Sequence, residues 1–520
     1  MKFSRLLSQI TIGSVNGVFT GMPGAPDPDV KSIHYRSQSV LPGGLFVAIP
    51  GHKADGHAFI GDAVARGAVA VIAEQPVDIG APCVQVADSR RALAQLSAGF
   101  YQNPSDALSV IGITGTNGKT TTTYLVESML VAADRFPGVI GTINYRYAGK
   151  TVENPVTTPE SLDLQRILAE MRQSGITHVA MEVSSHAIDL SRVERCGFDV
   201  AAFTNLTQDH LDYHGSMENY WACKQRLFTE YLARGAKKDR AVAVINVGNA
   251  HGRELFSLLR ESFPNQVISY GVTGEGRVYP VDFDQDGSGI RGRIMTPAGS
   301  FSFRSTLVGQ YNLENILCAT GIGLALTLPL SAICDGIQSL RNVPGRLEPV
   351  MNKTGRFIFV DYAHTPDALD NVLTALSALK RGARLLCVFG CGGDRDRAKR
   401  PIMGKIAAGH ADLVIVTSDN PRTEAPERII DEIVAGIRRE NTPLLTAADL
   451  VAGKRANGYL VAPDRKTAIR LGLMASGAGD ILLVAGKGHE TYQILGTTKI
   501  AFDDRRETLT ALSELEKEVA

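Results

Sequence analysis

The stretch that decides the fold is LSVIGITGTNGKTTTTYLVESMLVAAD, residues 108 to 134. Its pattern predicts an apolar strand, a glycine-rich turn and a helix. The backbone N–H groups of such a turn can surround phosphate oxygens at the start of the helix. Within it, Lys119 adds positive charge and Thr120 can ligate magnesium. The segment from Thr114 to Thr122 therefore predicts a nucleotide phosphate site in a parallel α/β sheet.

This loop is a variant of the common phosphate-binding pattern GxxxxGK[ST]. The pattern requires glycine at position 113, where the chain has Ile113, and Gly112 comes one place too early. A glycine turn that only packs a helix on a strand is the alternative interpretation. Four consecutive threonines after Lys119 are poor helix formers, however, and a bound polyanion would account for them. We favour the phosphate site.

The sequence on either side of the loop predicts three α/β domains. Strand candidates at 178–183, 200–205 and 241–246 alternate with helices, which predicts a doubly wound parallel sheet. Residues 267–303 are rich in glycine and favour inserted antiparallel hairpins. The alternation restarts with 356–364, 384–393, 411–421 and 480–488. We expect a small N-terminal α/β domain (1–106), a central doubly wound ATPase domain (107–343) and a C-terminal Rossmann-like domain (344–520).

Composition narrows the functional class. The chain has 520 residues, which is too long for a single hydrophobic core. Its 44% of hydrophobic and 21% of charged residues exclude a disordered protein. Lys plus Arg and Asp plus Glu each total 54, so no global charge favours nucleic acid or a membrane surface. Seven scattered cysteines indicate reduced thiols. The uncharged run 315–334 contains Pro329 and predicts a broken buried helix. We expect a cytoplasmic monomer that binds small molecules.

Polar residues follow two of the central strand candidates. Glu182 ends the strand in HVAMEVSSH, and TNLTQDHLDYHG carries Asp209, His210, Asp212 and His214 after the next one. Parallel sheets place functional residues at this carboxyl edge, and magnesium prefers oxygen ligands. For the DHLDYH loop the alternative is a capped helix start with solvated side chains. Lys224 would ordinarily be a solvent-facing helical lysine.

Three loops of the C-terminal third stand out in the same way. Residues 391–401, 417–427 and 485–493 bring Arg395, Asp419, Arg422 and Glu490 toward one crevice. Arginine forks suit a carboxylate and acidic groups suit an ammonium, so the mixture indicates a zwitterionic amino acid. Taken singly, each loop favours the alternative of a solvated charge run or a turn. The prediction of a site rests on three such loops at the ends of successive strands.

Together these motifs resemble the Mur ligases of peptidoglycan precursor synthesis. The similarity rests on TGTNGKTTT, MEVSSH, TNLTQDHLDYHG, PGRLE (344–348), VDYAHTPDAL (360–369) and GKGHE, and on HYRSQSVLPGGLFVAIPGHKADG (34–56). The tetrapeptide DNPR (419–422) is similar to the branch that adds meso-diaminopimelate to UDP-N-acetylmuramoyl-L-alanyl-D-glutamate. The resemblance implies an ATP-dependent amide ligase that works through an acyl phosphate, in cell wall synthesis and hence in cell shape and division.

The resemblance also implies roles for particular residues. Two magnesium ions would be held by Thr120, Glu182, His210 and a carbamylated Lys224, with Lys119 completing the catalytic set. ATP would contact Gly115, Thr116, Asn117, Gly118, Lys119, Thr120, Thr121, Asn312, Arg346 and Asp361. The UDP-muramoyl dipeptide would contact Ser37, His52, Lys53, Ala54, Thr157, Thr158, Ser184 and Arg192. Diaminopimelate would contact Arg395, Asp419, Asn420, Pro421, Arg422, Gly486 and Glu490.

Some positions depart from the family pattern, and two other functions stay open. Leu190, Arg36, Gln38 and Asn246 stand where relatives often have other residues. One alternative is folylpolyglutamate synthetase, a related amide ligase, although DNPR and the N-terminal domain argue against it. The other is a nucleotide-binding switch that makes no bond.

Overall fold

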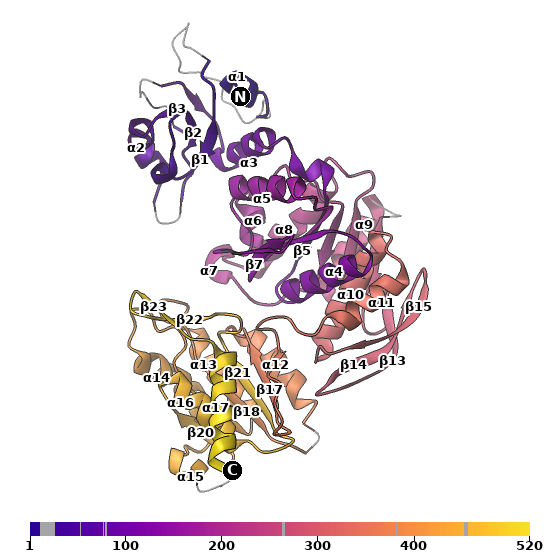
Figure 1. Ribbon diagram of the computed structural model, residues 1–520, viewed down its shortest axis with the longest axis vertical. Helices are drawn as coiled ribbons and strands as arrows, with labels where there is room; N and C mark the ends of the chain where they lie inside the picture. Colours follow the sequence, from indigo (N-terminus) through magenta and orange to yellow (C-terminus); the bar gives the residue numbers. More distant parts are fainter. Residues whose placement is uncertain are drawn as a thin grey trace.

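The computed structural model describes residues 1–10, 27–51, 54–75, 77, 81–262, 266–380, 382–451 and 456–519. The three largest sheets, one per domain, follow one another from top to bottom in Figure 1. This confirms the predicted three-domain α/β fold. The domain limits after residues 106 and 343 stay predictions.

The N-terminal domain contains a four-stranded parallel sheet with order β1-β2-β3-β4. Its strands are β1 (Ser32–His34), β2 (Gly44–Val47), β3 (Ala68–Ala73) and β4 (Cys83–Gln85), and its helices are α1 (Phe3–Leu7), α2 (Ile60–Ala65) and α3 (Ser89–Phe100). The helix α3 begins at Ser89. Asp88 caps it by accepting the backbone N–H of Arg91 at 2.9 Å.

The middle domain is built on an eight-stranded sheet with order β12-β11-β10-β5-β9-β6-β7-β8. Its strands are β5 (Ser109–Thr114), β6 (Pro137–Ile140), β7 (Asn144–Tyr147), β8 (Lys150–Glu153), β9 (His178–Glu182), β10 (Val200–Phe203), β11 (Val242–Asn246) and β12 (Val267–Tyr270). The pairs β6–β7 and β7–β8 are antiparallel, and the other pairs of this sheet are parallel. The predicted strands at 178–183, 200–205 and 241–246 are therefore confirmed as parallel neighbours of β5 or of one another.

Helices cover both faces of this sheet, and each face has its own apolar core. The helices are α4 (Lys119–Ala132), α5 (Ser161–Gln173), α6 (Ser185–Asp189), α7 (Leu211–His214), α8 (Met217–Arg226), α9 (Ala250–Ser262), α10 (Gln310–Ala325) and α11 (Leu330–Ser339), and a π-helix, η5 (Leu227–Leu232), continues α8. The charge-free run is buried over residues 315–323 and is broken as predicted, with α10 ending before Pro329 and α11 beginning after it. None of the described helices is long and apolar enough to cross a bilayer.

The inserted antiparallel sheet consists of β13 (Tyr279–Asp286), β14 (Gly289–Thr296) and β15 (Gly299–Ser305). The prediction of antiparallel hairpins is confirmed for this part. It is wrong for residues 267–270, because β12 pairs parallel with β11 at the edge of the main sheet. Three of the four residues of β12 are buried, as a strand covered on both faces requires.

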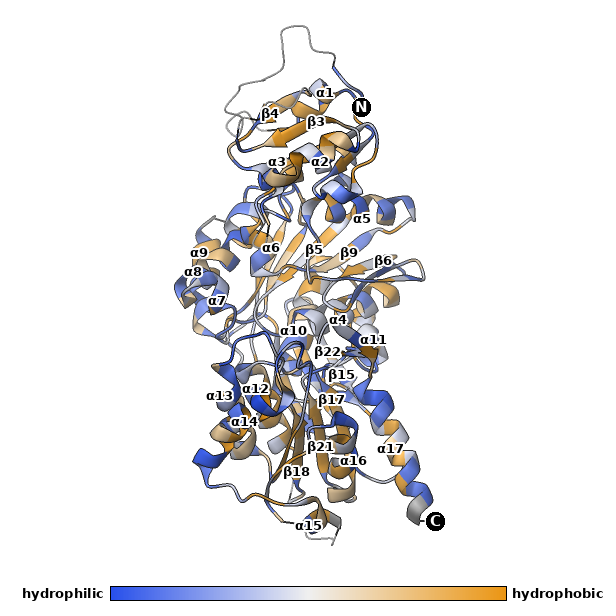
Figure 2. Cartoon of the chain, turned by 90° about the vertical axis from the view of Figure 1, so that its left-hand side faces the viewer, coloured by the Kyte–Doolittle hydropathy of each residue, from blue (hydrophilic) through white to orange (hydrophobic). Residues whose placement is uncertain are grey.

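The C-terminal domain has a six-stranded sheet with order β16-β17-β21-β18-β19-β20, all parallel except β16. Its strands are β16 (Glu348–Pro349), β17 (Phe357–Asp361), β18 (Leu385–Phe389), β19 (Leu413–Val416), β20 (Gly458–Val461) and β21 (Ile481–Ala485), with a separate hairpin of β22 (Tyr492–Leu495) and β23 (Thr498–Ala501). The helices are α12 (Pro366–Ser377), α13 (Lys399–His410), α14 (Pro426–Ile437), α15 (Ala447–Val451), α16 (Arg465–Ala475) and α17 (Asp504–Val519). Figure 2 shows β18 and β21 as mainly hydrophobic, in keeping with their burial between helices.

The N-terminal domain rests on α5 of the middle domain. Leu162 of α5 belongs to the N-terminal core, and the hydroxyl of Tyr35 donates a 2.7 Å hydrogen bond to Asp163. The seven cysteines, all of them among the described residues, form no disulfide bond with one another.

Candidate active site

The phosphate loop lies between the end of β5 and the start of α4. Gly115 and Gly118 have φ of +149° and +87°, a region that favours glycine. A Cβ on Gly118 would come 2.2 Å from Oδ1 of Asn315, and one on Gly115 would come 1.9 Å from Oγ1 of Thr204. No side chain caps α4, so its first N–H groups are available to an anion. The loop therefore has the geometry that its sequence predicted.

Two buried lysines meet at this loop. Lys119 Nζ donates to the carbonyls of Gly115 and Thr116, both at 2.8 Å. Lys224 Nζ donates to the same Gly115 carbonyl at 3.0 Å and lies 4.5 Å from the ring centre of Tyr220. Burial lowers the pKa of Lys119, and burial together with the Lys119 charge lowers the pKa of Lys224 well below its usual value. Lys224 is 1% exposed, so the solvent-facing interpretation is wrong.

The candidate metal ligands lie around these lysines. Glu182 is buried at the end of β9 and accepts the backbone N–H of Thr142 at 2.9 Å and its hydroxyl at 3.0 Å. The hydroxyl of Thr120 is buried in the first turn of α4. A carboxylate and a hydroxyl are the oxygen donors that magnesium prefers, so these two residues fit the ion. Among the described residues no cluster of three or more His, Cys, Asp or Glu side chains could hold a metal.

His210 lies in a group of aromatic rings that the sequence analysis did not predict. It has φ of +54°, and its ring lies 4.8 Å from that of His186, edge to face. His186 also contacts Tyr213, with ring centres 4.1 Å apart. Burial, with His210 and His214 nearby, lowers the pKa of His186 to about 4. Desolvation by the neighbouring groups also lowers the pKa of His210, whose side chain is 44% exposed, and this favours the neutral ring that a metal ligand needs.

The C-terminal domain contributes to the phosphate side of the site. Arg346 Nη2 donates to the hydroxyl of Thr120 at 3.3 Å, and its guanidinium lies 4.8 Å from the ring centre of Tyr362. Asp361 accepts the backbone N–H groups of Leu347 at 2.6 Å and Ala363 at 2.7 Å. Burial raises the pKa of Asp361. The Asp361 carboxylate thus shapes the turn that presents Arg346.

Two further contacts involve residues around the loop. The amide of Asn312 donates to the Val308 carbonyl at 2.8 Å and its Oδ1 accepts from Asn315 at 3.0 Å. The side chain of Asn315 in turn lies against Gly118, so Asn312 is connected to the phosphate loop through Asn315. Asp367, which the sequence analysis did not single out, accepts a 2.7 Å hydrogen bond from the amide of Asn117.

The four residues predicted for the muramoyl dipeptide on the middle domain lie together beside Glu182. Thr158 donates its hydroxyl to the Glu182 carbonyl at 2.9 Å and accepts the Ser184 N–H at 3.1 Å. Arg192 donates to the Thr158 carbonyl at 3.1 Å, and the Thr157 hydroxyl lies 3.1 Å from that of Thr142.

The other residues predicted for the UDP-muramoyl dipeptide lie in the N-terminal domain, around β2 in the sequence. Ser37 is buried in the short 3-10 helix η2 (Ser37–Ser39) between β1 and β2, and Ala54 is exposed after β2. His52 and Lys53 lie outside the described residues. Glu160 links Arg192 of the middle domain to α3 of the N-terminal domain. Its carboxylate lies 3.5 Å from Arg192 and 3.0 Å from Arg90 of α3.

The predicted amino-acid site is formed by three loops at the carboxyl edge of the C-terminal sheet. Arg422 Nη1 donates to the Gly393 carbonyl at 2.7 Å. A Cβ on Gly392 would lie 3.0 Å from Arg422 Nη1 and 3.8 Å from Arg395 Cγ, so both arginines approach one spot. Pro421 is buried beside them. The three predicted loops do converge.

The acidic part of that site lies on the neighbouring loop. Asn420 Nδ2 donates to Glu490 at 2.9 Å. Gly486 has φ of +116°, and a Cβ there would lie 3.1 Å from Asp419 Oδ2. Lys487 is buried among these groups, and the sequence analysis gave it no role.

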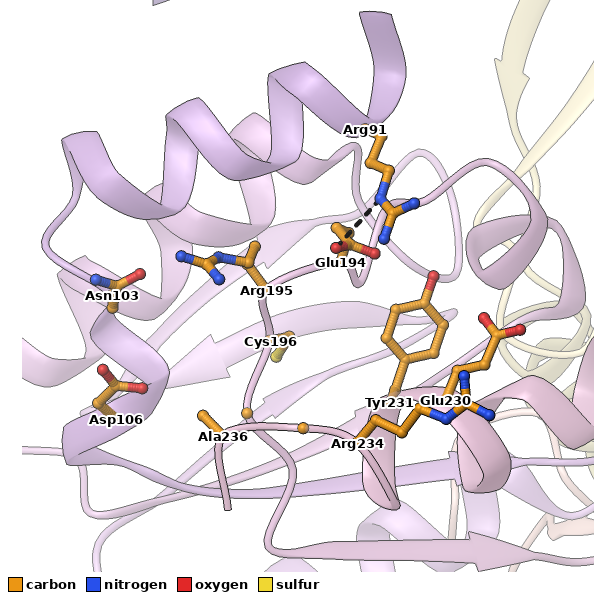
Figure 3. A pocket seen from close by; sticks show the side chains of 12 residues that line it. Arg91, Asn103, Asp106, Glu194, Arg195, Cys196, Glu230, Tyr231, Arg234 and Ala236 are labelled. Carbon is orange, nitrogen blue, oxygen red and sulfur yellow. Dashed lines mark ion pairs between the residues drawn. The ribbon is translucent and has the colours of Figure 1, made fainter. Parts of the chain in front are cut away.

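A separate cavity of about 550 Å³ lies where α3 faces the middle domain. Its lining includes Arg91, Glu194 and Tyr231, and Arg91 and Glu194 form a 3.5 Å ion pair (Figure 3). The segment 194–197 precedes β10, so the cavity lies at the amino edge of the sheet, opposite the phosphate loop. None of its lining residues is a predicted site residue.

Comparisons with known proteins identify the class. The family descriptions "Mur ligase family, catalytic domain", "Mur ligase middle domain" and "Mur ligase, glutamate ligase domain" match residues 29–101, 113–323 and 345–488. The chain belongs to the Mur ligase family, whose members are ATP-dependent ligases.

The similar relatives carry one specific name. UDP-N-acetylmuramoyl-L-alanyl-D-glutamate–2,6-diaminopimelate ligase of Geobacter metallireducens is 49% identical over 94% of this chain and 95% of its own. The protein of that name from Geobacter sulfurreducens is 47% identical over 93% and 94%. A solved structure of a ligase of that name aligns with TM-score 0.68 and 31% identity over 99% of this chain and all of the other.

Proposed function

We propose that this protein joins meso-2,6-diaminopimelate to UDP-N-acetylmuramoyl-L-alanyl-D-glutamate, with ATP as co-substrate, in cytoplasmic peptidoglycan precursor synthesis. The observation that carries the proposal is the contact between the carboxyl edge of the middle-domain sheet and the carboxyl edge of the C-terminal sheet. Thr120 and Asn117 of the phosphate loop region bond to Arg346 and Asp367 of the domain that also holds Arg422 and Glu490. An activated acid on one domain can therefore be reached by an amine held on the other.

The chemistry follows from these positions. The γ-carboxylate of the D-glutamate residue attacks the γ-phosphorus of ATP and releases ADP, which forms an acyl phosphate. The neutral amine of diaminopimelate then attacks the acyl carbon, phosphate leaves, and the amine loses a proton to give the amide. Lys119 and the N–H groups of the phosphate loop stabilise charge on the transferring phosphoryl group, so positioning and electrostatics supply most of the catalysis.

Magnesium belongs to this proposal. Thr120, Glu182, His210 and a carbamylated Lys224 would hold two ions, which when bound neutralise charge on the phosphoryl oxygens. Lys224 is buried and contacts a loop carbonyl beside the Lys119 ammonium. A carbamate in this position would replace a second cation by an anion that tolerates a divalent metal.

The substrate-binding residues complete the proposal. Thr157, Thr158, Ser184 and Arg192 line the edge beside Glu182, where the acceptor carboxylate must approach ATP. Ser37, His52, Lys53 and Ala54 are proposed for the UDP-sugar end. Arg422 and Arg395 pair with the distal carboxylate of diaminopimelate, a group that lysine lacks, and Asp419 and Glu490 face its ammonium.

The test is mass spectrometry of the product formed from UDP-muramoyl dipeptide, ATP and meso-diaminopimelate by the full-length protein. We expect one amide-linked tripeptide and one phosphate per product. Lysine in place of diaminopimelate should give far less product. Glutamate addition to a folate would support the polyglutamate ligase instead, and ATP hydrolysis that ignores both acceptor and amino acid would support a nucleotide switch. Light scattering of the same sample tests the expected monomer.

A further inference from the structure

Lys487 is a fully buried cation that follows β21 in the amino-acid site. Its side chain is 0% exposed, and its Nζ lies 2.8 Å from Oε2 of Glu490 and 3.1 Å from Oδ1 of Asn420. Oδ1 of Asp419 lies 3.6 Å away. Burying an ammonium costs several kcal/mol unless it is paired and hydrogen-bonded. The pairing here is with three residues that are all proposed to bind diaminopimelate.

The backbone forces the side chain inward. Gly486 and Gly488, on either side of Lys487, have φ of +116° and +53°. A Cβ on Gly488 would come 2.6 Å from the Cβ of Tyr362, so the turn packs tightly against the loop after β17. The aliphatic stem of Lys487 is therefore held by the fold, and its ammonium has little freedom to leave the cluster.

The charges of this cluster do not balance without a ligand. Asp419 and Glu490 are two mostly buried carboxylates, and in the described part of the chain their ion pairs are with Lys487 alone. Arg465 lies nearby, but its guanidinium bonds to Asp504 twice, at 2.7 Å each. Oδ1 of Asp419 is buried and has no hydrogen-bond partner among the described residues. One net negative charge and one free acceptor therefore remain.

We propose that Lys487 is a positioning residue of the amino-acid site: it fixes Asn420 and Glu490 and cancels one carboxylate charge, so that the remaining charge matches the single distal ammonium of the incoming amino acid. This inference rests on the proposed function. Lys487 touches neither ATP nor the reacting amine and acts through the residues that it holds. Asn420 transmits the effect further, because its Oδ1 also accepts the Ile494 N–H at 2.9 Å.

The experiment compares steady-state kinetics of Lys487→Met, Lys487→Gln and Lys487→Arg in the full-length protein. We expect the two neutral variants to raise KM for meso-diaminopimelate at least about tenfold, because two adjacent carboxylates then repel and reorient. KM for ATP and for the UDP-muramoyl dipeptide should change less than about twofold. Lys487→Arg keeps the charge and should recover part of the loss. Lys499→Met is the matched control, since the Nζ atoms of Lys487 and of exposed Lys499 lie 5.5 and 4.0 Å from the ring centre of Tyr492.

The outcomes are distinct. An equal rise of all three KM values, an unchanged KM for diaminopimelate, or failure of both neutral variants to fold would make Lys487 a purely structural residue and overturn the inference. Product formation by the wild type in the same assay separates a failure of the proposed function from a failure of the inference about Lys487. If the wild type makes no tripeptide, the proposed function and this inference both fall; if it does, the variants test Lys487 alone.

Discussion

Oδ2 of Asp367 accepts a 2.7 Å hydrogen bond from the side-chain amide of Asn117, and this bond joins the C-terminal domain to the phosphate loop. The same oxygen accepts the Thr207 hydroxyl at 2.7 Å. Asn117 follows β5 and Thr207 follows β10, so one carboxylate connects α12 to two loops of the middle domain. Asp367 lies in the first turn of α12, where the helix dipole favours an anion.

Replacing Asp367 by alanine should loosen the two domains. Hydrogen bonds to a charged acceptor contribute about 1.5 to 3 kcal/mol each, and both interdomain bonds of this carboxylate would be lost. Small-angle scattering of the variant without ligands should show a larger radius of gyration than the wild type. Asp370→Ala on the same helix is the control, because Asp370 bonds to His410 within its own domain. Equal radii for all three proteins would contradict the prediction.

Lys119→Ala should weaken nucleotide binding. The ammonium is buried at the phosphate loop, and loss of a charge-assisted contact to phosphate should lower affinity about tenfold to a hundredfold. Calorimetric titration with ATP and magnesium measures this directly. Lys150→Ala removes an exposed lysine from β8 and should leave affinity unchanged. Wild-type affinity in Lys119→Ala would exclude the proposed role of the loop.

The central strands could be predicted because they are short, apolar and covered on both faces. HVAME of β9 and VAAF of β10 are almost entirely buried, so each forms an uninterrupted apolar run. The strands β6 to β8 were missed for the opposite reason. KTVE of β8 is exposed at every position, and PGVI of β6 begins with two turn-forming residues. Of these three strands only β8 is at the edge of the sheet, and β6 and β7 lie next to it, so their pairing depends on tertiary context.

The residues of the candidate site likewise divide into those that the sequence could predict and those that it could not. Phosphate-loop residues are local in sequence, so their turn and helix could be predicted together. Lys224 carried a local signal that was not used: it lies on one helical stripe with the buried Tyr220, Leu227 and Phe228. Asp367 carried none, because its partner Asn117 is 250 residues away. Contacts between domains depend on docking that no local pattern describes.

Arg422→Ala should reduce the use of diaminopimelate selectively. The guanidinium is held by the Gly393 carbonyl beside Arg395, and the proposed partner is a carboxylate that lysine lacks. We expect kcat/KM for meso-diaminopimelate to fall about tenfold to a hundredfold, with a smaller change for lysine. Arg428→Ala, on the exposed face of α14, should behave as the wild type. Equal losses for both amines would refute a role in specificity.

Carbamylation of Lys224 should make activity depend on dissolved carbon dioxide. Enzyme prepared in buffer stripped of carbon dioxide should lose activity, and bicarbonate should restore it. Isotope-labelled bicarbonate should give one carbamate signal by nuclear magnetic resonance, absent from Lys224→Arg. Lys237 provides an internal comparison: it is also buried, but it pairs with Asp199 at 2.5 Å and should stay unmodified. A labelled signal that persists in Lys224→Arg would assign the carbamate elsewhere.

Acid should open the amino-acid site through Glu424. The buried guanidinium of Arg400 bonds to both Glu424 oxygens, at 2.7 and 2.9 Å, and also to the Gly392 carbonyl at 3.2 Å. These bonds lower the pKa of Glu424 from 4.5 to about 2. Because the folded-state pKa is depressed, the stabilisation is complete above pH 4.5 and is lost as the pH falls toward about 2.

Glu424→Gln should therefore lower the free energy of opening of the α13–α14 pair by about 1.5 to 3 kcal/mol at neutral pH. The difference from wild type should shrink as the pH falls from about 4.5 and vanish below about pH 2, where the wild-type carboxyl is also neutral. Hydrogen exchange of α13 and α14 over this range measures it. Glu427→Gln, an exposed change in the first turn of α14, should show no such trend. A difference that stays constant with pH would mean that Glu424 acts by shape and not by charge, and the loops that carry Arg422 and Arg395 would then keep their geometry in acid.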